Sequence, residues 1–339
     1  MIVRPAEARD NDALCRMEEK SVQGTQIKLT VRRRDYFFRA KHFRDSVLMV
    51  AEDNGVLLGV MGMAFQRLRV GGTFHKGALI FDWRANPEVS DRGLNPVMGR
   101  IWVALDAVAK DRGVEFLFGL VKKDNVRSKR ILTRGGAQFV GTRKFYLFPV
   151  TRRRRVAAGV EVLDDYDFAE DRRLVAEHYR DYDLVPDWTS GEETLSRKYC
   201  RGLIRCGQTS IRLWDSSEDY QKIAVSIPWY YSAARPVVQA LRGLLPLPRI
   251  PAPGDVVRTW DVYDPIVHSQ GELCEVMRAA NNLAMEANAD YLVVTADTRE
   301  KELTAFCKRA IASLEYEILL KPLVEVPAIT KTYCDIRWL

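Results

Sequence analysis

The hydrophobic and polar positions between residues 78 and 141 fall into a regular order. An apolar run, Ala78–Trp83, is followed by a polar turn with one glycine at residues 86–95. A stretch of helical period, Pro96–Asp111, then leads to a second apolar run, Val114–Val121. This order predicts a strand, a turn, a helix and a second strand parallel to the first.

The residues before this unit have the pattern of antiparallel strands. Val47–Glu52 and Val56–Phe65 flank Asp53-Asn54-Gly55, a strong hairpin turn, and Gly71-Gly72 marks a second turn. Antiparallel strands that lead into a parallel pair predict a mixed sheet of the α/β class.

The second half of the chain repeats this outline. Strand, helix and strand patterns cover Val256–Tyr263, Gln270–Asn288 and Asp290–Thr295, offset from the first unit by about 176 residues. Thr332–Leu339 is expected to be a last strand. Two separate segments could also converge on the same order, so the pattern favours an internal repeat without requiring one.

A chain of 339 residues is long for one domain. We predict an N-terminal domain at residues 1–150, a basic linker at 151–158 and a second domain at 159–339. The linker contains Arg152-Arg153-Arg154-Arg155, which is expected to be a solvated run, with an anion-binding patch as the alternative.

Composition narrows the class of protein. Apolar residues make up 47% of the chain and charged residues 29%, as in globular proteins. The six cysteines contain no C-x-x-C pair and there are four histidines, so we expect reduced thiols and no metal site.

The first residues lack a signal-peptide pattern and no apolar run is long enough to span a membrane, so we expect a cytoplasmic protein without a membrane partner. The net charge of +7 favours an anionic ligand, and we do not expect a nucleic-acid partner. Nothing in the sequence indicates the oligomeric state.

The turn before the first long helix has the features of an anion site. The first N–H groups of a helix lack internal partners and carry partial positive charge. Pro96 suits the first turn, and Gly93 would let a pyrophosphate approach the backbone closely. The alternative is an ordinary connection between a strand and a helix.

Across the whole stretch, Asn86-Pro87-Glu88, Gly93, Gly113, Asn125-x-x-Ser128 and Gly135-Gly136-Ala137-Gln138-Phe139 occur in an order that resembles the acyl-CoA-binding half of GNAT-type N-acyltransferases. In that family the turn reads Gln/Arg-x-x-Gly-x-Gly/Ala. This chain has Ser90, Gly93 and Asn95 there, so only the central glycine matches. Asn125 lies where the family holds the pantetheine arm, and Leu132 lies where the family often has a tyrosine acid.

The resemblance implies a fold of two tandem GNAT-like domains, each with a mixed, mostly antiparallel sheet and a splayed parallel strand pair flanked by helices. In the first domain the pair would be Ile80–Ala85 and Glu115–Leu120, with the pantetheine arm of acetyl-CoA or another acyl-CoA in the gap. The residues expected to bind this co-substrate are Trp83, Arg84, Ala85, Asp91, Arg92, Gly93, Leu94, Asn95, Asn125 and Ser128. In the second domain Glu272 and Glu275 lie in the first turn of the helix and would compete with a phosphate, so we expect one cofactor site per chain.

Acyl transfer to an amine requires a base, hydrogen-bond donors for the oxyanion and an acid for the thiolate. Asp82 is the candidate base, with an ion pair to an arginine such as Arg84 as the alternative interpretation. Asp261 and Asp264 are further candidates if the two halves share a cleft. Tyr146 is the candidate acid, although strand tyrosines are more often packing residues. Backbone N–H groups of residues 83–85 would stabilise the oxyanion.

The sequence therefore predicts an acetyl- or acyl-CoA-dependent N-acyltransferase that acts on an amine of a small molecule or peptide. One alternative is a tRNA-dependent aminoacyl transferase similar to the peptidoglycan bridge enzymes. Another is a CoA-binding sensor without catalytic activity, which the differences at Ser90, Asn95 and Leu132 favour.

Overall fold

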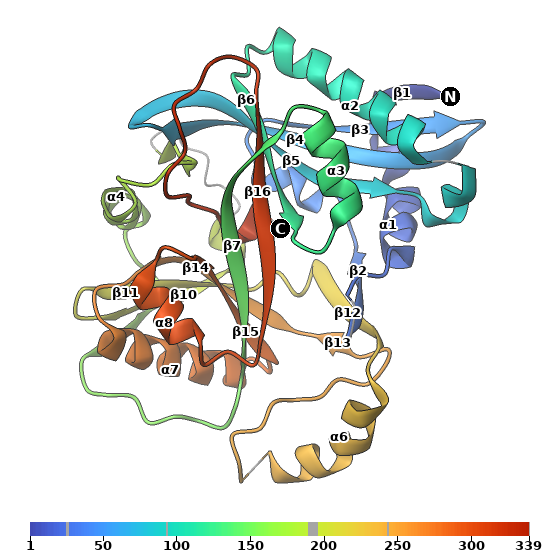
Figure 1. Cartoon of the computed structure of the whole chain (residues 1–339). Helices are drawn as coiled ribbons and strands as arrows, with labels where there is room; N and C mark the ends of the chain where they lie inside the picture. The colour runs from blue at the N-terminus through green and yellow to red at the C-terminus, as the bar shows by residue number, and fades with distance from the viewer. Residues whose placement is uncertain (25–26, 93, 189–195, 243, 339) are drawn as a thin grey trace.

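The computed structural model describes residues 1–24, 27–92, 94–188, 196–242 and 244–338, apart from the side chains of residues 90–95 and 196. In this part of the chain a long mixed sheet runs through the molecule, with helices on its faces (Figure 1). The strands of the first half are β1 (Ile2–Pro5), β2 (Lys28–Arg33), β3 (Ser46–Asp53), β4 (Val56–Val70), β5 (Thr73–Ala85), β6 (Phe116–Lys122) and β7 (Gln138–Pro149). Those of the second half are β8 (Val160–Leu163), β9 (Val185–Pro186), β10 (Cys200–Cys206), β11 (Thr209–Trp214), β12 (Tyr220–Ser226), β13 (Val256–Val257), β14 (Thr259–Ile266), β15 (Tyr291–Asp297) and β16 (Ala312–Pro322).

Eight α-helices lie between groups of these strands in the described part of the chain. They are α1 (Asn11–Lys20), α2 (Leu94–Asp111), α3 (Val126–Arg134), α4 (Phe168–His178), α5 (Ser196–Tyr199), α6 (Trp229–Leu241), α7 (Gln270–Glu286) and α8 (Lys301–Cys307). Short 3₁₀ turns include η2 (Tyr36–Phe38), η3 (Ala40–His42), η4 (Pro87–Arg92) and η6 (Ile336–Trp338). Among the helices of the described residues, none is long and apolar enough to cross a bilayer.

The pattern of strand pairing in the large sheet is the same from both ends. It reads β1-β3-β4-β5-β6-β16-β7-β15-β14-β11-β10-β8, with β9 paired to β4 outside this path. Read from either end, each half contributes an antiparallel run followed by a parallel pair, which is β5 with β6 in the first half and β14 with β15 in the second. The predicted fold of two mixed sheets, each with a parallel pair, is confirmed, and the two sheets are joined into one.

The two halves join by exchanging strands. Strand β16, from the end of the chain, lies between β6 and β7, where Ile318 is opposite both Leu120 and Gly141. Strand β7 pairs on its other edge with β15 of the second half. A separate three-stranded sheet, β13-β12-β2, also joins the halves. Main-chain hydrogen bonds therefore cross between the two proposed domains. The domain boundary at residues 150–159 stays a prediction.

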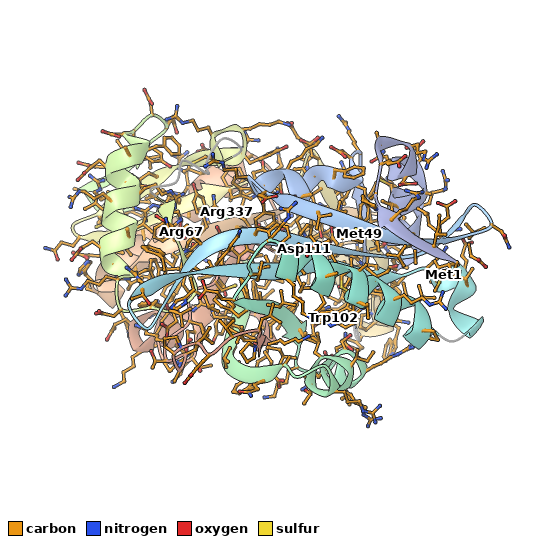
Figure 2. The ribbon with its side chains drawn as sticks, turned by 90° about the horizontal axis from the view of Figure 1, so that it is seen from above. Met1, Met49, Arg67, Trp102, Asp111 and Arg337 are labelled. Atoms are coloured by element: carbon orange, nitrogen blue, oxygen red, sulfur yellow. The ribbon has the colours of Figure 1, made fainter. Side chains whose placement is uncertain are left out.

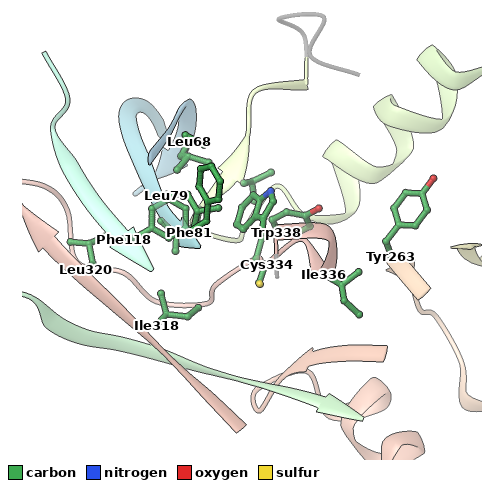
Figure 3. Packing of buried hydrophobic residues seen from close by; sticks show 14 of the residues in the cluster. Leu68, Leu79, Phe81, Phe118, Tyr263, Ile318, Leu320, Cys334, Ile336 and Trp338 are labelled. Atoms are coloured by element: carbon green, nitrogen blue, oxygen red, sulfur yellow. The ribbon is translucent and has the colours of Figure 1, made fainter. Parts of the chain in front are cut away.

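The largest hydrophobic cluster contains residues from both halves. Figure 3 shows members of this cluster from both halves, with Leu68, Leu79, Phe81 and Phe118 of the first and Ile318, Leu320, Tyr263 and Trp338 of the second. A second cluster lies between α2 and strands β3 to β5, and Figure 2 shows α2 running along this sheet with Trp102 and Asp111 labelled. A third cluster packs α7 and α8 against β14 and β15. Because burial of apolar surface is the main stabilising term, the shared cluster ties the halves into one folding unit.

The C-terminal residues differ from their predicted conformation. Thr332–Leu339 was expected to be a strand, but residues 332–338 form an isolated bridge from Thr332 to Asp183 followed by the turn η6. Their side chains point into the core, with Tyr333, Cys334, Ile336 and Trp338 all buried. The apolar character of this segment comes from filling space between the halves, and the strand prediction was wrong.

Candidate active site

The parallel pair β5 and β6 separates soon after it begins. Only Gly77, Ala78 and Leu79 pair with Phe116, Leu117 and Phe118, although both strands continue for several residues. Beyond this point the facing residues Ile80, Trp83, Gly119 and Leu120 are only half-buried. A Cβ on Gly119 would have its nearest neighbour, the Ile80 carbonyl oxygen, at 3.5 Å, so a small side chain would fit there. The described backbone therefore has the splayed pair that the sequence predicted, with the two strands diverging towards their carboxyl ends.

A β-bulge shapes the β5 side of this opening. Gly62 is opposite Phe81 and Val60 is opposite Arg84, so Met61 alone is opposite two residues of β5. One of the two is Asp82, whose φ is 48°. A bulge leaves its extra residue outside the ladder and re-aims the backbone, which is compatible with donors near residues 83–85 for an oxyanion.

The Asp82 carboxylate is bound by two arginines inside the protein. Arg33 donates two hydrogen bonds to it at 2.9 and 3.0 Å, and Arg39 donates one at 2.8 Å. Burial alone would raise the pKa of Asp82, but Arg33 and Arg39 outweigh burial and hold this pKa below its ordinary value. A carboxylate held in this way is a weak base, so the ion-pair interpretation is favoured, although with Arg33 and Arg39 as partners in place of Arg84.

Arg84 has a different partner, the buried Glu18 of α1, at 2.6 Å. Glu18 also accepts a hydrogen bond from Arg33 at 2.7 Å. Arg33 thus links the two carboxylates of this buried cluster, Glu18 and Asp82. Lys122, half-buried on β6, lies close enough to Arg84 for an electrostatic effect: burial lowers the pKa of Lys122, Asp124 opposes this change and Arg84 adds to it. Like charges beside the opening would be stabilised by an anion.

The predicted phosphate-binding turn falls mostly outside the described residues. Gly93 is not described, and for Asp91, Arg92, Leu94 and Asn95 only the backbone course is. Residues 87–92 form η4, and α2 begins at Leu94. The functional prediction for this turn stays a prediction.

Asn125 and Ser128 lie at the start of α3. The Asn125 side chain accepts a hydrogen bond from the Ser128 backbone N–H at 3.1 Å, so Asn125 is the N-cap of this helix. An N-cap residue is an ordinary structural element, and the predicted contact with a pantetheine arm remains untested. Leu132, at the family's tyrosine position, is buried against Val121 and Leu319.

The structure does not bring Tyr146 and Asp82 together. Tyr146 lies on β7, packed in the cluster formed by α7, α8 and β15, and burial raises its pKa. Asp82 belongs to the ion cluster beside α1 and β2. This placement favours the packing interpretation of Tyr146.

The second parallel pair also diverges, but its gap is filled. Pairing ends at Val262 and Val294, and residues 263–266 and 295–297 beyond it are all buried. The Thr332 hydroxyl donates to Asp297 at 2.9 Å, and the Tyr333 hydroxyl donates to Asp264. The C-terminal segment therefore occupies the position that is open between β5 and β6.

The N-terminus of α7 is likewise occupied by its own side chains. Ser269 caps the helix by accepting from the Glu272 N–H at 3.2 Å. The Glu272 carboxylate accepts from the Thr209 hydroxyl at 2.7 Å, and Glu275 accepts from the Ala157 N–H at 2.9 Å. Both carboxylates thus lie in the first part of the helix, where they oppose an incoming phosphate.

A small pocket lies between the two halves. It measures about 40 Å³, enough for a few water molecules, and its walls come from both halves and from the C-terminal segment. The lining residues that matter for chemistry are Arg39, His42, Trp214, Tyr220, Lys222 and Asp261. Arg39 joins this pocket to the β5 bulge because it also binds Asp82.

Asp261 has the properties of a base that Asp82 lacks. Among the described residues no hydrogen bond or ion pair engages its carboxylate. Burial raises the pKa of Asp261 to about 6, and the nearby Asp215 and Asp335 add to this effect while Lys222 opposes it. Asp264, the other alternative, is bound by Arg172 and Tyr333 instead. Asp261 was a candidate base on the condition that the two halves share a cleft. Residues of both halves line this pocket.

Sequence reasoning missed the inner arginines of the ion cluster. Arg33 lies in the run Arg32-Arg33-Arg34, which has the appearance of a solvated charged run, yet its side chain is fully buried. The available signal was the strand pattern: successive side chains of a strand point to opposite faces, so the middle one of three arginines can point inward while its neighbours point outward.

No group of three or more possible metal ligands occurs among the residues that the structure describes.

Comparison of the sequence with family models and with curated proteins found no match. Solved structures do match. The N-myristoyltransferase of Saccharomyces cerevisiae with bound myristoyl-CoA aligns with a TM-score of 0.64 at 10% identity, covering 97% of this chain and 82% of that chain. A Pyrococcus horikoshii protein provisionally described as an acetyltransferase aligns with a TM-score of 0.54 at 11% identity, covering 98% of this chain and 94% of that chain. At these identities the likeness concerns the fold.

Proposed function

We propose, on the premise of this GNAT-like N-acyltransferase fold, that the protein transfers an acyl group from an acyl-CoA to an amine. The co-substrate would bind in the N-terminal half only. The observation that carries this proposal is the contrast between the two parallel pairs, because Ile80, Gly119 and Leu120 beyond the pairing of β5 and β6 are half-buried, whereas the residues beyond the pairing of β14 and β15 are buried under the C-terminal segment. Crevices at the carboxyl ends of parallel strands are common ligand sites.

The charges around the opening are consistent with an anionic co-substrate. The positive charge of Lys122, which lies near Arg84, would attract the phosphates of CoA. The turn at residues 91–95 would hold the pyrophosphate and Asn125 and Ser128 the pantetheine arm, as the resemblance implies. Acetyl-CoA is the donor to test first.

The acceptor amine would enter from the pocket between the halves. Asp261 would remove a proton from the amine, since a carboxyl group whose pKa is about 6 is largely ionised at neutral pH and is a stronger base than an ordinary aspartate. Asp82 would act as a fixed structural anion that holds Arg33 and Arg39 beside the bulge. The small volume of the pocket favours a single amine group, either of a small molecule or at the end of a peptide.

Calorimetry with acetyl-CoA tests the location of the site. Gly119→Leu would fill the opening, because the Cβ position already lies 3.5 Å from the Ile80 carbonyl oxygen. We expect this variant to lose at least about tenfold in affinity for acetyl-CoA, equivalent to about 1.4 kcal/mol, with a melting temperature close to that of the wild type.

The matched control is Thr295→Val at the corresponding position of β15. The Thr295 hydroxyl is buried without a partner among the described residues, so this change of similar volume should keep or raise stability and leave the affinity unchanged. Unchanged affinity in Gly119→Leu would contradict the proposed location. Binding of acetyl-CoA without thiol release across a panel of amines would support the sensor alternative, and activity that requires added tRNA would support the aminoacyl transferase.

A further inference from the structure

Helix α6 lies at the periphery of the molecule. Figure 1 shows it at the end of a long excursion between β12 and β13, away from the large sheet. None of its side chains is buried, and Trp229 at its start is 80% exposed. A thirteen-residue helix with no buried side chain obtains little stabilisation from the core of its own chain.

The apolar stripe of α6 faces away from the protein. Tyr230, Ala234, Val237 and Leu241 follow the 4-3-4 spacing of one helical face and are all exposed, with Val237 at 62%. Leu244 and Leu245 continue this surface past the end of the helix at 71% and 46% exposure.

A second stripe of α6, which is mainly polar, faces the body. Arg235, Val238, Gln239 and Arg242 share the other face and are half-buried. Arg235 Nε and Gln239 Nε2 both donate to the Ile250 carbonyl oxygen, at 3.2 and 3.4 Å. The polarity of the helix is thus the reverse of that expected for a surface helix of a globular protein, in which the apolar stripe turns inward.

A run of arginines begins next to the segment that follows α6. Arg152 Nη1 donates to the Leu244 carbonyl oxygen at 3.0 Å, which places Arg152 just past the end of α6. The next arginines run on along α7, where the Arg154 N–H donates to the Asn282 side chain at 2.7 Å. All four arginines are exposed. Arg153 pairs with Glu286 at 3.2 Å, whereas Arg152, Arg154 and Arg155 form no ion pair with any carboxylate of the described residues.

We propose that α6 and residues 152–155 together bind the surface of an anionic phospholipid bilayer. An outward stripe of tyrosine, valine and leucine with a tryptophan at its start suits the boundary between headgroups and acyl chains. Unpaired arginines beside such a stripe are complementary to lipid phosphates, and each basic residue near an anionic surface adds to the attraction. A groove-binding protein partner would not require this cluster of positive charge.

The earlier expectation of no membrane partner rested on the lack of a spanning segment. A helix that lies in the plane of the interface needs no such segment, so the two statements concern different modes of association. The proposal is independent of the acyltransferase function, because neither α6 nor residues 152–155 line the opening between β5 and β6 or the pocket.

Sedimentation of the full-length protein with vesicles tests this proposal. The vesicles would be phosphatidylcholine alone or with about 30% phosphatidylglycerol, and we expect at least about tenfold stronger binding to the anionic ones, weakened by salt. The fluorescence of Trp229 should shift to the blue on binding. The triple variant W229S/V237S/L241S and the variant R152Q/R154Q/R155Q should each reduce binding by about tenfold or more.

The matched control is Phe139→Ser, which removes an apolar side chain of 59% exposure from another surface and should leave binding unchanged. Absence of binding to either type of vesicle would overturn the proposal, as would binding that the triple variant does not weaken. A concentration-dependent dimer that the triple variant abolishes, without vesicle binding, would assign the stripe to a second copy of the chain instead and would equally overturn it.

Discussion

At the scale of single residues, the candidate site is dominated by charges buried inside the protein. Glu18, Arg33 and Asp82 come from a helix and two strands that are far apart in sequence, and each depends on the others for its partner. Removing one member leaves an uncompensated charge in a region of low dielectric, which is why such clusters are sensitive to single substitutions.

Asp82→Asn separates the structural role of this residue from a catalytic one. We expect it to destabilise the protein by about 3–5 kcal/mol in urea unfolding, because Arg33 and Arg39 lose their shared carboxylate. The control Asp181→Asn, at a side chain of 85% exposure, should change stability by less than about 1 kcal/mol. A variant of Asp82 with wild-type stability but no turnover would restore Asp82 as the base.

The raised pKa of Asp261 predicts how the stability of the protein depends on pH. Because burial raises its pKa to about 6 in the folded state, the folded protein binds the proton more tightly than the unfolded chain does. Its contribution to stability is therefore fully present below pH 4 and decreases as the pH rises through about 6, by about 1.4 kcal/mol per unit of pKa difference.

The measurement is the free energy of unfolding between about pH 4 and 7, compared with the variant Asp261→Asn. The difference between wild type and variant should change over this interval, and nuclear magnetic resonance of the Asp261 carboxyl carbon should give the midpoint directly. A midpoint near that of an ordinary aspartate, about 3.9, would remove the physical basis for Asp261 as the proposed base.

At the scale of elements, local sequence signals were sufficient for much of the fold. Asn54 and Gly55 adopt positive φ angles of 49° and 78° between β3 and β4, as their turn chemistry requires. The parallel pair β5 and β6 and the helix α7 also follow from apolar runs and helical period. These features depend on residues close in sequence, and pattern reasoning is most reliable there.

Elements that depend on distant partners could not be predicted in the same way. The apolar residues of the C-terminal segment suggested a strand, but their pattern does not distinguish pairing from the filling of a gap between halves. The position of β16 between β6 and β7 is also invisible in the sequence, because it is decided by contacts between residues about 200 positions apart. The same holds for the side of α6 that faces the body.

At the scale of the whole molecule, the exchange of strands in the large sheet makes each half dependent on the other. Without β16, the edge of β6 would present unpaired main-chain groups, and the shared cluster would lose Ile318, Leu320 and Trp338. Exposed edges of this kind promote association. We therefore expect a fragment of residues 1–150 to aggregate or to form oligomers when it is produced alone.

Co-expression of residues 1–150 with residues 151–339 should recover a soluble complex, as judged by gel filtration and circular dichroism. A monomeric 1–150 fragment that unfolds cooperatively would contradict the expected dependence. It would instead establish the first predicted domain as an independent folding unit.

The position of β16 also bears on how the protein is made. A ribosome that adds about 5–20 residues per second completes β6 roughly ten seconds or more before β16 leaves the exit tunnel. During that interval β6 lacks the neighbour that later separates it from β7. Nascent chains must therefore keep this edge from pairing with the wrong strand, and β7, which is synthesised next, is the nearest competitor. Slow release of the second half would favour such a mispaired intermediate, so the rate of translation becomes a determinant of yield.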